Sequence, residues 1–357
     1  MSPSARREVL ASLEEQREVD PKPRVAEPAN EQGLRPRNLA EFIGQGELVS
    51  HLRIVVEAAR RRGEPVDHVL LAGPPGLGKT SLAAIVAAEM GASLRVTSGP
   101  VLTRAGDLAA MLTDLNDGDV LFIDELHRLA KAVEEVLYPA MEDGKLDIVV
   151  GKGPTARSIR LDLPRFTLVG ATTRMGMLSD PLRARFGFIG RVDLYEPAEL
   201  EGIVTRAAAI LGVEVDPEGA AEIARRSRGT PRIANRLLAR VRDYAQVERQ
   251  GRIDREVAAE GLELFGVDAM GLDKVDRAIL GELCQRYAGR AVGLTALAQA
   301  IGEDPSTIED AYEPFLVQQG FVLRTPQGRL ATSRAYEHLG VAVPKGAEPG
   351  LFDVPQV

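Results

Sequence analysis

The stretch Gly73-Pro-Pro-Gly-Leu-Gly-Lys-Thr80 decides the fold, because it matches the pattern GxxxxGK[ST] of a phosphate-binding loop. An apolar run of strand length precedes it, and a helical pattern follows. In such a unit glycines let backbone N–H groups approach phosphate, and the start of the helix favours negative charge. We expect Gly76 and Gly78 to shape the loop, Lys79 to reach the β- and γ-phosphates, and Thr80 to ligate Mg²⁺.

A second motif, Val120-Leu-Phe-Ile-Asp-Glu125, has the pattern of a buried strand that ends in two carboxylates. At the carboxyl end of a central strand beside the phosphate loop, Asp124 would orient hydrated Mg²⁺ and Glu125 would polarise the attacking water. Strand-end acids are often only turn residues. Following a phosphate loop, however, this pair indicates a hydrolytic site.

Three arginines further along the chain are candidates for phosphate contacts. Arg183 and Arg185 lie in Pro181-Leu-Arg-Ala-Arg-Phe-Gly187, which is either a solvated basic turn or the source of an arginine finger, a group that a neighbouring subunit can supply. Arg232, in Gly229-Thr-Pro-Arg232, begins a predicted helix. A cation there opposes the helix dipole unless an anion is nearby, so its position suggests a phosphate ligand.

The composition limits the fold classes and functions that the chain can have. The chain has 357 residues, 45% apolar and 27% charged, which predicts a folded protein of two or three domains. The single Cys284 is expected to be a core residue, and the four histidines without CxxC or HExxH give no basis for a zinc or iron site. The absence of a long apolar run or secretory signal predicts a cytoplasmic location. The net charge of −8 argues against nucleic acid, unless a local cationic patch is hidden in the average.

The order of patterns predicts several domains. Short apolar runs at 68–72, 119–123 and 166–170, separated by helical stretches, indicate an α/β domain with a buried parallel sheet. Between about residues 199 and 266 the sequence shows no strand pattern and has amphipathic helical patterns instead. The segment Gly320–Ala331 predicts two short strands after helices, which is a winged-helix pattern. We expect a flexible N-terminal arm at 1–32, the α/β domain at 33–197, a small helical domain at 198–265, a winged-helix domain at 266–340 and a flexible tail at 341–357.

One interruption of the α/β pattern predicts a hairpin. Two strand-like segments flank a turn rich in glycine and proline, and together they span about residues 146–163. This hairpin is either an edge hairpin or an arm that docks a partner.

Together these motifs resemble those of AAA+ ATPases. Thr172-Thr173-Arg174 and the segment Glu41-Phe-Ile-Gly-Gln45 belong to the same resemblance. More narrowly, the chain resembles the RuvB family of Holliday-junction branch-migration motors over about residues 34–340. That narrower resemblance rests on four further segments: Thr97-Ser-Gly-Pro100, Asp124-Glu-Leu-His-Arg-Leu129, Tyr138-Pro-Ala-Met-Glu142 and Gly229-Thr-Pro-Arg-Ile-Ala-Asn-Arg236.

The resemblance implies a role for each matching residue. Leu34, Arg35 and Tyr195 would line the adenine end of bound ATP. Phosphates and Mg²⁺ would be held by four residues of the loop: Gly76, Lys79, Thr80 and Ser81. Thr173 would be sensor 1, with Thr172 as the alternative. Arg185 would act in trans on a neighbour's ATP with Arg183 nearby, Arg232 would be sensor 2, and Glu142-Asp143-Gly144 would also lie by nucleotide.

The resemblance also implies DNA and protein partners. These are four-way junction DNA held by its backbone, RuvA docked on the 146–163 hairpin, RuvC in a wider complex, and further copies of the chain in a homohexamer. Arg324 and Arg329 are the expected DNA contacts, since no acidic residue lies between Gly320 and Tyr336. An acidic body with only a few cations at the wing predicts weak, strongly salt-dependent DNA binding. The alternatives are an AAA+ switch or clamp-loader subunit that does not translocate, and a protein unfoldase, for which no aromatic pore loop is evident.

Overall fold

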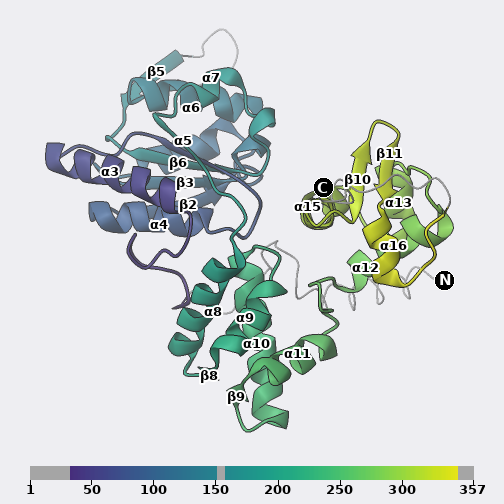
Figure 1. The fold of residues 1–357 in the computed structure, drawn as a ribbon. Coiled ribbons are helices and arrows are strands. Elements are labelled where there is room, and N and C mark those ends of the chain that lie inside the picture. The colour runs from purple at the N-terminus through teal and green to yellow at the C-terminus, as the bar shows by residue number, and fades with distance from the viewer. Residues whose placement is uncertain (1–32, 151–156, 345–357) are drawn as a thin grey trace, which may run out of the picture. The chain divides into compact units, whose positions relative to one another are not determined.

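The computed structural model describes residues 33–150 and 157–344 (Figure 1). The expected N-terminal arm and the tail beyond Pro344 lie outside the described residues. The described chain divides between Tyr195 and Glu196 into two compact units. No helix among the described residues is long and apolar enough to span a membrane.

The first unit contains a five-stranded parallel sheet in the order β2-β3-β6-β1-β7. Its strands are β1 (Val69–Ala72), β2 (Leu94–Ser98), β3 (Val120–Asp124), β6 (Thr167–Thr172) and β7 (Phe188–Arg191). The three central strands, β1, β3 and β6, are the ones that the apolar runs predict, and all of their residues except Asp124 are buried. The two edge strands are absent from the sequence prediction because they are half-exposed and carry mixed polar and apolar residues.

Helices cover both faces of this sheet (Figure 1). They are α3 (Gly46–Arg62), α4 (Lys79–Met90), α5 (Ala105–Thr113), α6 (Lys131–Glu142) and the short α7 (Asp180–Arg183). On one face α4 packs against β2, β3 and β6 and also contacts α3. On the other, leucines and valines of α5 and α6 share a core with Leu121, Ile123 and Leu168. The parallel α/β architecture expected from the sequence is therefore confirmed.

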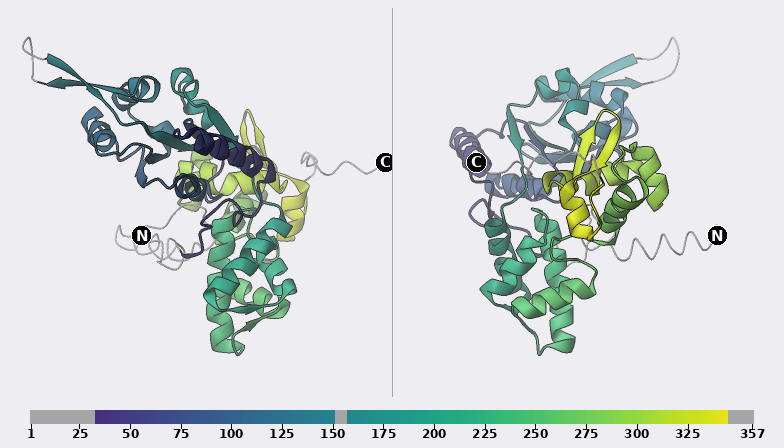
Figure 2. Two further views of the ribbon diagram at one scale, coloured as in Figure 1. Left: turned by 90° about the vertical axis from the view of Figure 1, so that its left-hand side faces the viewer. Right: turned by 45° about the vertical axis from the view of Figure 1, so that its right-hand side comes forward.

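A hairpin outside the sheet is formed by β4 (Lys145–Val150) and β5 (Arg157–Asp162), which pair antiparallel. Figure 2 shows it projecting from the first unit. Leu146 is buried in the core beneath α6, which anchors the base of the hairpin. Asp147 and Arg160 lie directly opposite each other and form a bidentate ion pair with distances of 2.7 and 3.0 Å, which favours this register.

The second unit begins with four helices, α8 (Pro197–Leu211), α9 (Pro217–Arg225), α10 (Pro231–Glu248) and α11 (Arg255–Leu264). The prediction that this segment lacks strands is wrong in one detail. β8 (Glu214–Val215) and β9 (Arg252–Ile253) pair in parallel, and Arg252 forms an ion pair with Asp216 beside them. Two residues per strand are too few to produce a periodic pattern in the sequence.

The rest of the second unit is a winged helix. Its helices are α12 (Lys274–Gly281), α13 (Leu294–Ile301), α14 (Pro305–Thr307), α15 (Glu313–Gln318) and α16 (Ser333–Leu339), and its wing is β10 (Val322–Thr325) paired antiparallel with β11 (Gly328–Ala331). One core joins these elements. Cys284 lies in that core, as expected, and burial raises the pKa of its thiol to about 11, which makes it unreactive.

Candidate active site

The strand order brings three of the predicted motifs to one edge of the sheet. β6 lies between β3 and β1, with Ile123 opposite Gly170 and Ala72 opposite Thr172. Because parallel strands end at the same edge, the phosphate loop after β1, the acids after β3 and the threonines at the end of β6 lie side by side. Three segments far apart in the sequence thus form one site.

The phosphate loop has the backbone that an anion needs. Gly76 and Gly78 adopt φ values of +80° and +97°, which only glycine adopts readily. Gly78 precedes α4, and no side chain caps that helix, so its first N–H groups point into the loop. Lys79 is 7% exposed and donates hydrogen bonds to the carbonyl oxygens of Gly73 (2.8 Å) and Pro74 (2.7 Å). A positive charge and a helix N-terminus without a side-chain cap together fit a phosphate group.

Gly73 is required by a close approach between two strands. A Cβ atom placed on it would lie 2.1 Å from the carbonyl oxygen of Val192. We expect Gly73→Ala to destabilise the fold by roughly 1–3 kcal/mol, because the backbone at the start of the loop must shift. Gly106→Ala is the matched control, since no atom lies within 4 Å of its added Cβ and alanine favours a helix. Urea unfolding measures both, and equal stability of the two variants would contradict the expectation.

The two acids occupy a strained turn. Asp124 accepts a hydrogen bond from the backbone N–H of Glu125 at 2.8 Å, and Glu125 has a φ of +48°, which is uncommon outside glycine. The Glu125 carboxylate forms a 2.8 Å ion pair with Arg128, and both side chains are about half exposed. An exposed pair of this kind contributes at most about 1 kcal/mol, so Glu125 can exchange Arg128 for water at low cost.

The two threonines at the end of β6 have different surroundings. Thr172 is fully buried, its hydroxyl accepts a hydrogen bond from the N–H of Arg174 at 3.0 Å, and it lies 3.1 Å from Nδ1 of His127. Thr173 is exposed at the edge where the loop and the acids lie. Thr173 is thus the more accessible of the two sensor candidates, whereas Thr172 is buried against His127 at the strand end.

Aromatic residues flank the other side of the loop. Tyr195 is 5% exposed and donates a hydrogen bond to the carbonyl oxygen of Leu77 at 3.1 Å. The ring of Phe42 would lie 3.3 Å from a Cβ on Gly78. Leu34 is buried and Arg35 is partly exposed in the same unit.

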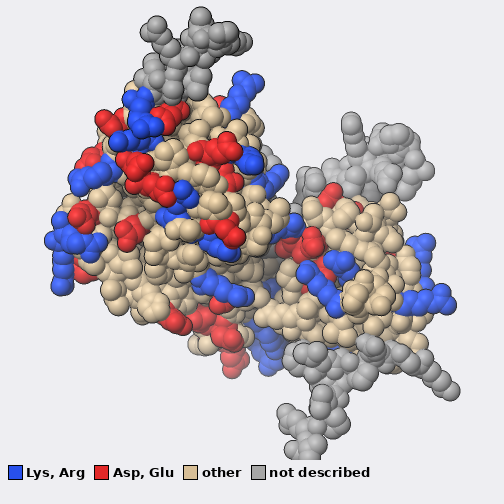
Figure 3. All heavy atoms as spheres, turned by 90° about the horizontal axis from the view of Figure 1, so that it is seen from above, with Lys and Arg blue, Asp and Glu red and all other residues tan. Residues whose placement is uncertain are grey.

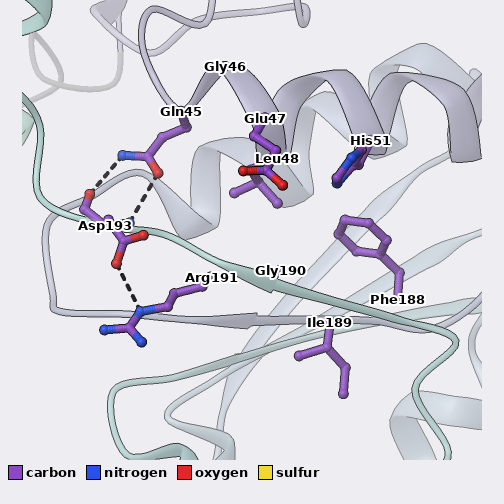
Figure 4. Close-up of a pocket in the computed structure, with 10 residues that line it drawn as sticks. All are labelled: Gln45, Gly46, Glu47, Leu48, His51, Phe188, Ile189, Gly190, Arg191 and Asp193. Carbon is purple, nitrogen blue, oxygen red and sulfur yellow. Dashed lines mark hydrogen bonds and ion pairs between the residues drawn. The ribbon is translucent and has the colours of Figure 1, made fainter.

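Two hydrogen bonds just after β7 hold the chain close to Tyr195. Gln45, the last residue of the Glu41–Gln45 segment, donates to the carbonyl oxygen of Asp193 at 2.7 Å and accepts from its N–H at 3.0 Å (Figure 4). The carboxylate of Asp193 also pairs with Arg191. These hydrogen bonds hold the chain two residues before Tyr195. The Glu41–Gln45 segment therefore supports the phosphate loop indirectly.

Arg185 is held by two residues of α6. Its guanidinium forms a 2.9 Å ion pair with Glu142 and lies 4.4 Å from the centre of the Tyr138 ring. The side chain of Arg185 is 20% exposed. Arg183, by contrast, pairs with Asp180 on α7. Sequence reasoning gave no physical reason for the Glu142-Asp143-Gly144 segment. In the structure this segment ends the helix that holds Arg185.

Tyr138 is a site residue that sequence reasoning missed. The signal was the helical spacing of Tyr138 and Glu142, which places both side chains on one face of α6.

The remaining candidates lie in the second unit. Arg232 is the second residue of α10. Arg324 and Arg329 are opposite each other in the wing, and both pair with Glu313, which is 2% exposed. The sequence shows no acid close to these arginines, but the tertiary structure adds one from α15. Arg324 is 52% exposed, whereas Arg329 is 18% exposed.

Comparisons with known proteins agree along nearly the whole chain. Family models match at residues 34–192 (the Holliday junction DNA helicase RuvB P-loop domain), 195–268 (the RuvB AAA lid domain) and 269–340 (the RuvB C-terminal winged helix domain). The Holliday junction branch migration complex subunit RuvB of Mycolicibacterium gilvum is 58% identical over 95% of this chain and 96% of its own. The Mycobacterium tuberculosis protein of the same name is 58% identical over 94% and 98%.

A solved structure gives the same result. The Thermotoga maritima RuvB Holliday junction branch migration motor superposes with a TM-score of 0.80 at 51% identity, covering 88% of this chain and all of that one. Matches to three successive domain models, together with relatives far above 30% identity, leave one conclusion. The chain belongs to the RuvB family of AAA+ P-loop ATPases.

Proposed function

We propose that this chain is an ATP-driven motor that moves four-way DNA junctions during homologous recombination and repair, working as a homohexameric ring. The observation that carries the proposal is the edge of the sheet where the phosphate loop, the acid pair and Thr173 meet. Relatives named as branch migration subunits match nearly all of the chain, which supports the same substrate here.

Each residue at this edge has a task that its geometry supports. The N–H groups of Gly76, Gly78 and Ser81 and the ammonium of Lys79 hold phosphate oxygens. Thr80 and Asp124 would hold Mg²⁺, which offsets the negative charge of the phosphates. Glu125 accepts a proton from the attacking water after releasing Arg128, and the exposed hydroxyl of Thr173 orients that water. Leu34, Arg35 and Tyr195 enclose the base at the other end of the loop.

A second subunit would complete the site. Arg185 stabilises charge on the γ-phosphate of its neighbour, with Arg183 close by, and Glu142-Asp143-Gly144 reaches that nucleotide because Glu142 is ion-paired with Arg185. Arg232, at the start of α10, opposes its helix dipole, and a phosphate beside it would offset that cost. ATP bound between subunits can link hydrolysis to motion around a ring.

The proposed partners match exposed features of the chain. The β4–β5 hairpin stands outside the sheet, its register is favoured by the pair of Asp147 and Arg160, and Leu161 is 37% exposed on it. These features suit an arm that docks RuvA, with RuvC joining the wider complex. The face in Figure 3 carries Lys and Arg interspersed with Asp and Glu, which limits indiscriminate DNA binding.

The wing arginines are expected to respond differently to substitution. Arg324→Ala should weaken DNA binding and lower the slope of log K against log salt by about 1, because one exposed phosphate contact is lost. Arg329→Ala should mainly lower the free energy of unfolding, by roughly 1–3 kcal/mol, because Arg329 binds both oxygens of the buried Glu313 whereas Arg324 binds only one of them. Salt titrations of binding and urea unfolding measure the two effects. An unchanged salt slope for Arg324→Ala would remove it from the DNA contacts.

The test of the function is a synthetic four-way junction incubated with the protein, ATP and RuvA, each omitted in turn. We expect junction movement that needs both ATP and RuvA. ATP hydrolysis stimulated by DNA without any junction movement would instead favour the non-translocating switch.

A further inference from the structure

The loop between α9 and α10 carries a buried arginine that points into the winged-helix domain. Arg228 lies four residues before Arg232, in the loop that leads into α10, and its φ of +55° is in the left-handed region. Its guanidinium pairs with Asp276 on α12, and the two side chains are 2% and 0% exposed. The same group lies 4.9 Å from the centre of the Phe315 ring on α15. One residue of the helical domain thus contacts two helices of the winged helix.

The connection between the two domains is held by arginines from both sides. Arg228 donates from Nε to the carbonyl oxygen of Gly271 at 2.8 Å, and Arg226 donates to that of Val267 at 3.1 Å. From the winged helix, Arg277 donates to the carbonyl oxygens of Gly266 (3.1 Å) and Leu272 (2.9 Å). These hydrogen bonds hold the carbonyl groups of the interdomain segment and oppose a hinge motion there.

Close packing and a cap strengthen this connection. A Cβ on Gly271 would lie 2.7 Å from the carbonyl oxygen of Arg226, so the two chains touch backbone to backbone. Asp276 also accepts from the N–H of Asp273 at 2.8 Å and thereby caps the start of α12. An isolated buried charge is costly, so Arg228 and Asp276 each require the other.

The contacts continue to the wing. Phe315, beneath Arg228, lies on the same short helix as Glu313, which pairs with Arg324 and Arg329. A series of contacts therefore runs from Arg228, in the loop before α10, through α15 to the wing arginines.

We propose that Arg228 and Asp276 are positioning residues that lock the winged-helix domain to the start of α10, so that a nucleotide-driven displacement of Arg232 is delivered to the DNA-holding wing. The helical domain and the winged helix then move together as one rigid body. This inference rests on the proposed function for its use of Arg232 and the wing, but the rigid link itself does not depend on it.

The first test is a distance measurement in the full-length protein. Spin labels on Val247→Cys in α10 and Gln327→Cys in the wing turn report the separation of the two domains, and both sites are exposed. Cys284 is 3% exposed and remains unlabelled. We expect one narrow distance distribution, unchanged by ATP, which Asp276→Asn broadens. Asp216→Asn, which alters an ion pair within the helical domain alone, is the matched control and should leave the distribution narrow.

The second test separates coupling from stability. We expect Asp276→Asn to hydrolyse ATP at close to the normal rate while the number of base pairs moved per ATP falls about fivefold or more. A purely structural defect would lower hydrolysis and movement by the same factor. Arg228→Lys, which keeps the charge but loses the fork that reaches Gly271 and Asp276 together, should give a smaller loss in case Asp276→Asn folds poorly.

A narrow distribution and normal movement per ATP in both variants would overturn the proposal. If the unaltered protein moves no junction, the proposed function fails, while the distance measurement still decides whether the link is rigid.

Discussion

Glu125→Gln is expected to leave ATP binding intact and to lower hydrolysis about 10²- to 10⁴-fold. The amide keeps the shape of the side chain on its strained turn but cannot accept the proton of the attacking water. The phosphate loop, Lys79 and Asp124 are unchanged, so nucleotide affinity should stay close to that of the unaltered protein. Steady-state ATP hydrolysis with and without DNA, together with a nucleotide-binding titration, measures both quantities.

Two controls sharpen this experiment. Glu64→Gln changes a carboxylate that pairs with Arg62 on the surface, and it should hydrolyse ATP normally. Arg128→Gln removes the ion-pair partner of Glu125 and should keep most of the activity, because that pair is exposed and weak. Full DNA-stimulated hydrolysis by Glu125→Gln would show that another group activates the water, and the assigned mechanism would be wrong.

Arg185→Ala is expected to lower ATP hydrolysis about 10³- to 10⁵-fold, the range known for arginine fingers. The loss should appear in kcat, because this guanidinium meets charge that develops during phosphoryl transfer. Subunit stability should change little, since Arg185 is partly exposed and its partner Glu142 is more than half exposed. Arg165→Ala, which breaks a surface pair with Asp117, is the matched control and should hydrolyse ATP normally.

Mixing subunits tests whether Arg185 acts in trans. Neither Arg185→Ala nor Lys79→Ala rings should hydrolyse ATP alone. Mixed rings contain interfaces in which an intact phosphate loop of the first variant meets an intact Arg185 of the second, so activity should return at intermediate ratios. A lack of ATP hydrolysis at every mixing ratio would indicate that the site is completed within one subunit.

Glu142 and Tyr138 show what local sequence reasoning misses around Arg185. Both lie on α6, more than forty residues before Arg185, and only the fold brings the carboxylate within 2.9 Å and the ring within 4.4 Å of the guanidinium. The helical spacing of Tyr138 and Glu142 could have shown that they share a face. It could not have shown what that face contacts, because helix packing depends on the whole core.

The wing illustrates the same limit for charge. No acidic residue is close to Arg324 and Arg329 in the sequence, so the sequence predicts that these arginines have no acidic partner. The tertiary structure places Glu313 beneath both, because α15 packs under the wing. Charge along the chain therefore describes the hairpin itself but not the acid that a helix outside the hairpin places beneath it.

By itself the sequence determined the phosphate loop, the acid pair, the three central strands and the winged-helix pattern, because each depends on residues that are close in the chain and on buried runs that leave a clear apolar signal. The edge strands, the different burial of Thr172 and Thr173, the holding of Arg185 by α6 and the Arg228–Asp276 link were decided only by the tertiary structure. Each of these depends on strand order or on burial between distant segments, and neither quantity is encoded in any short stretch of residues.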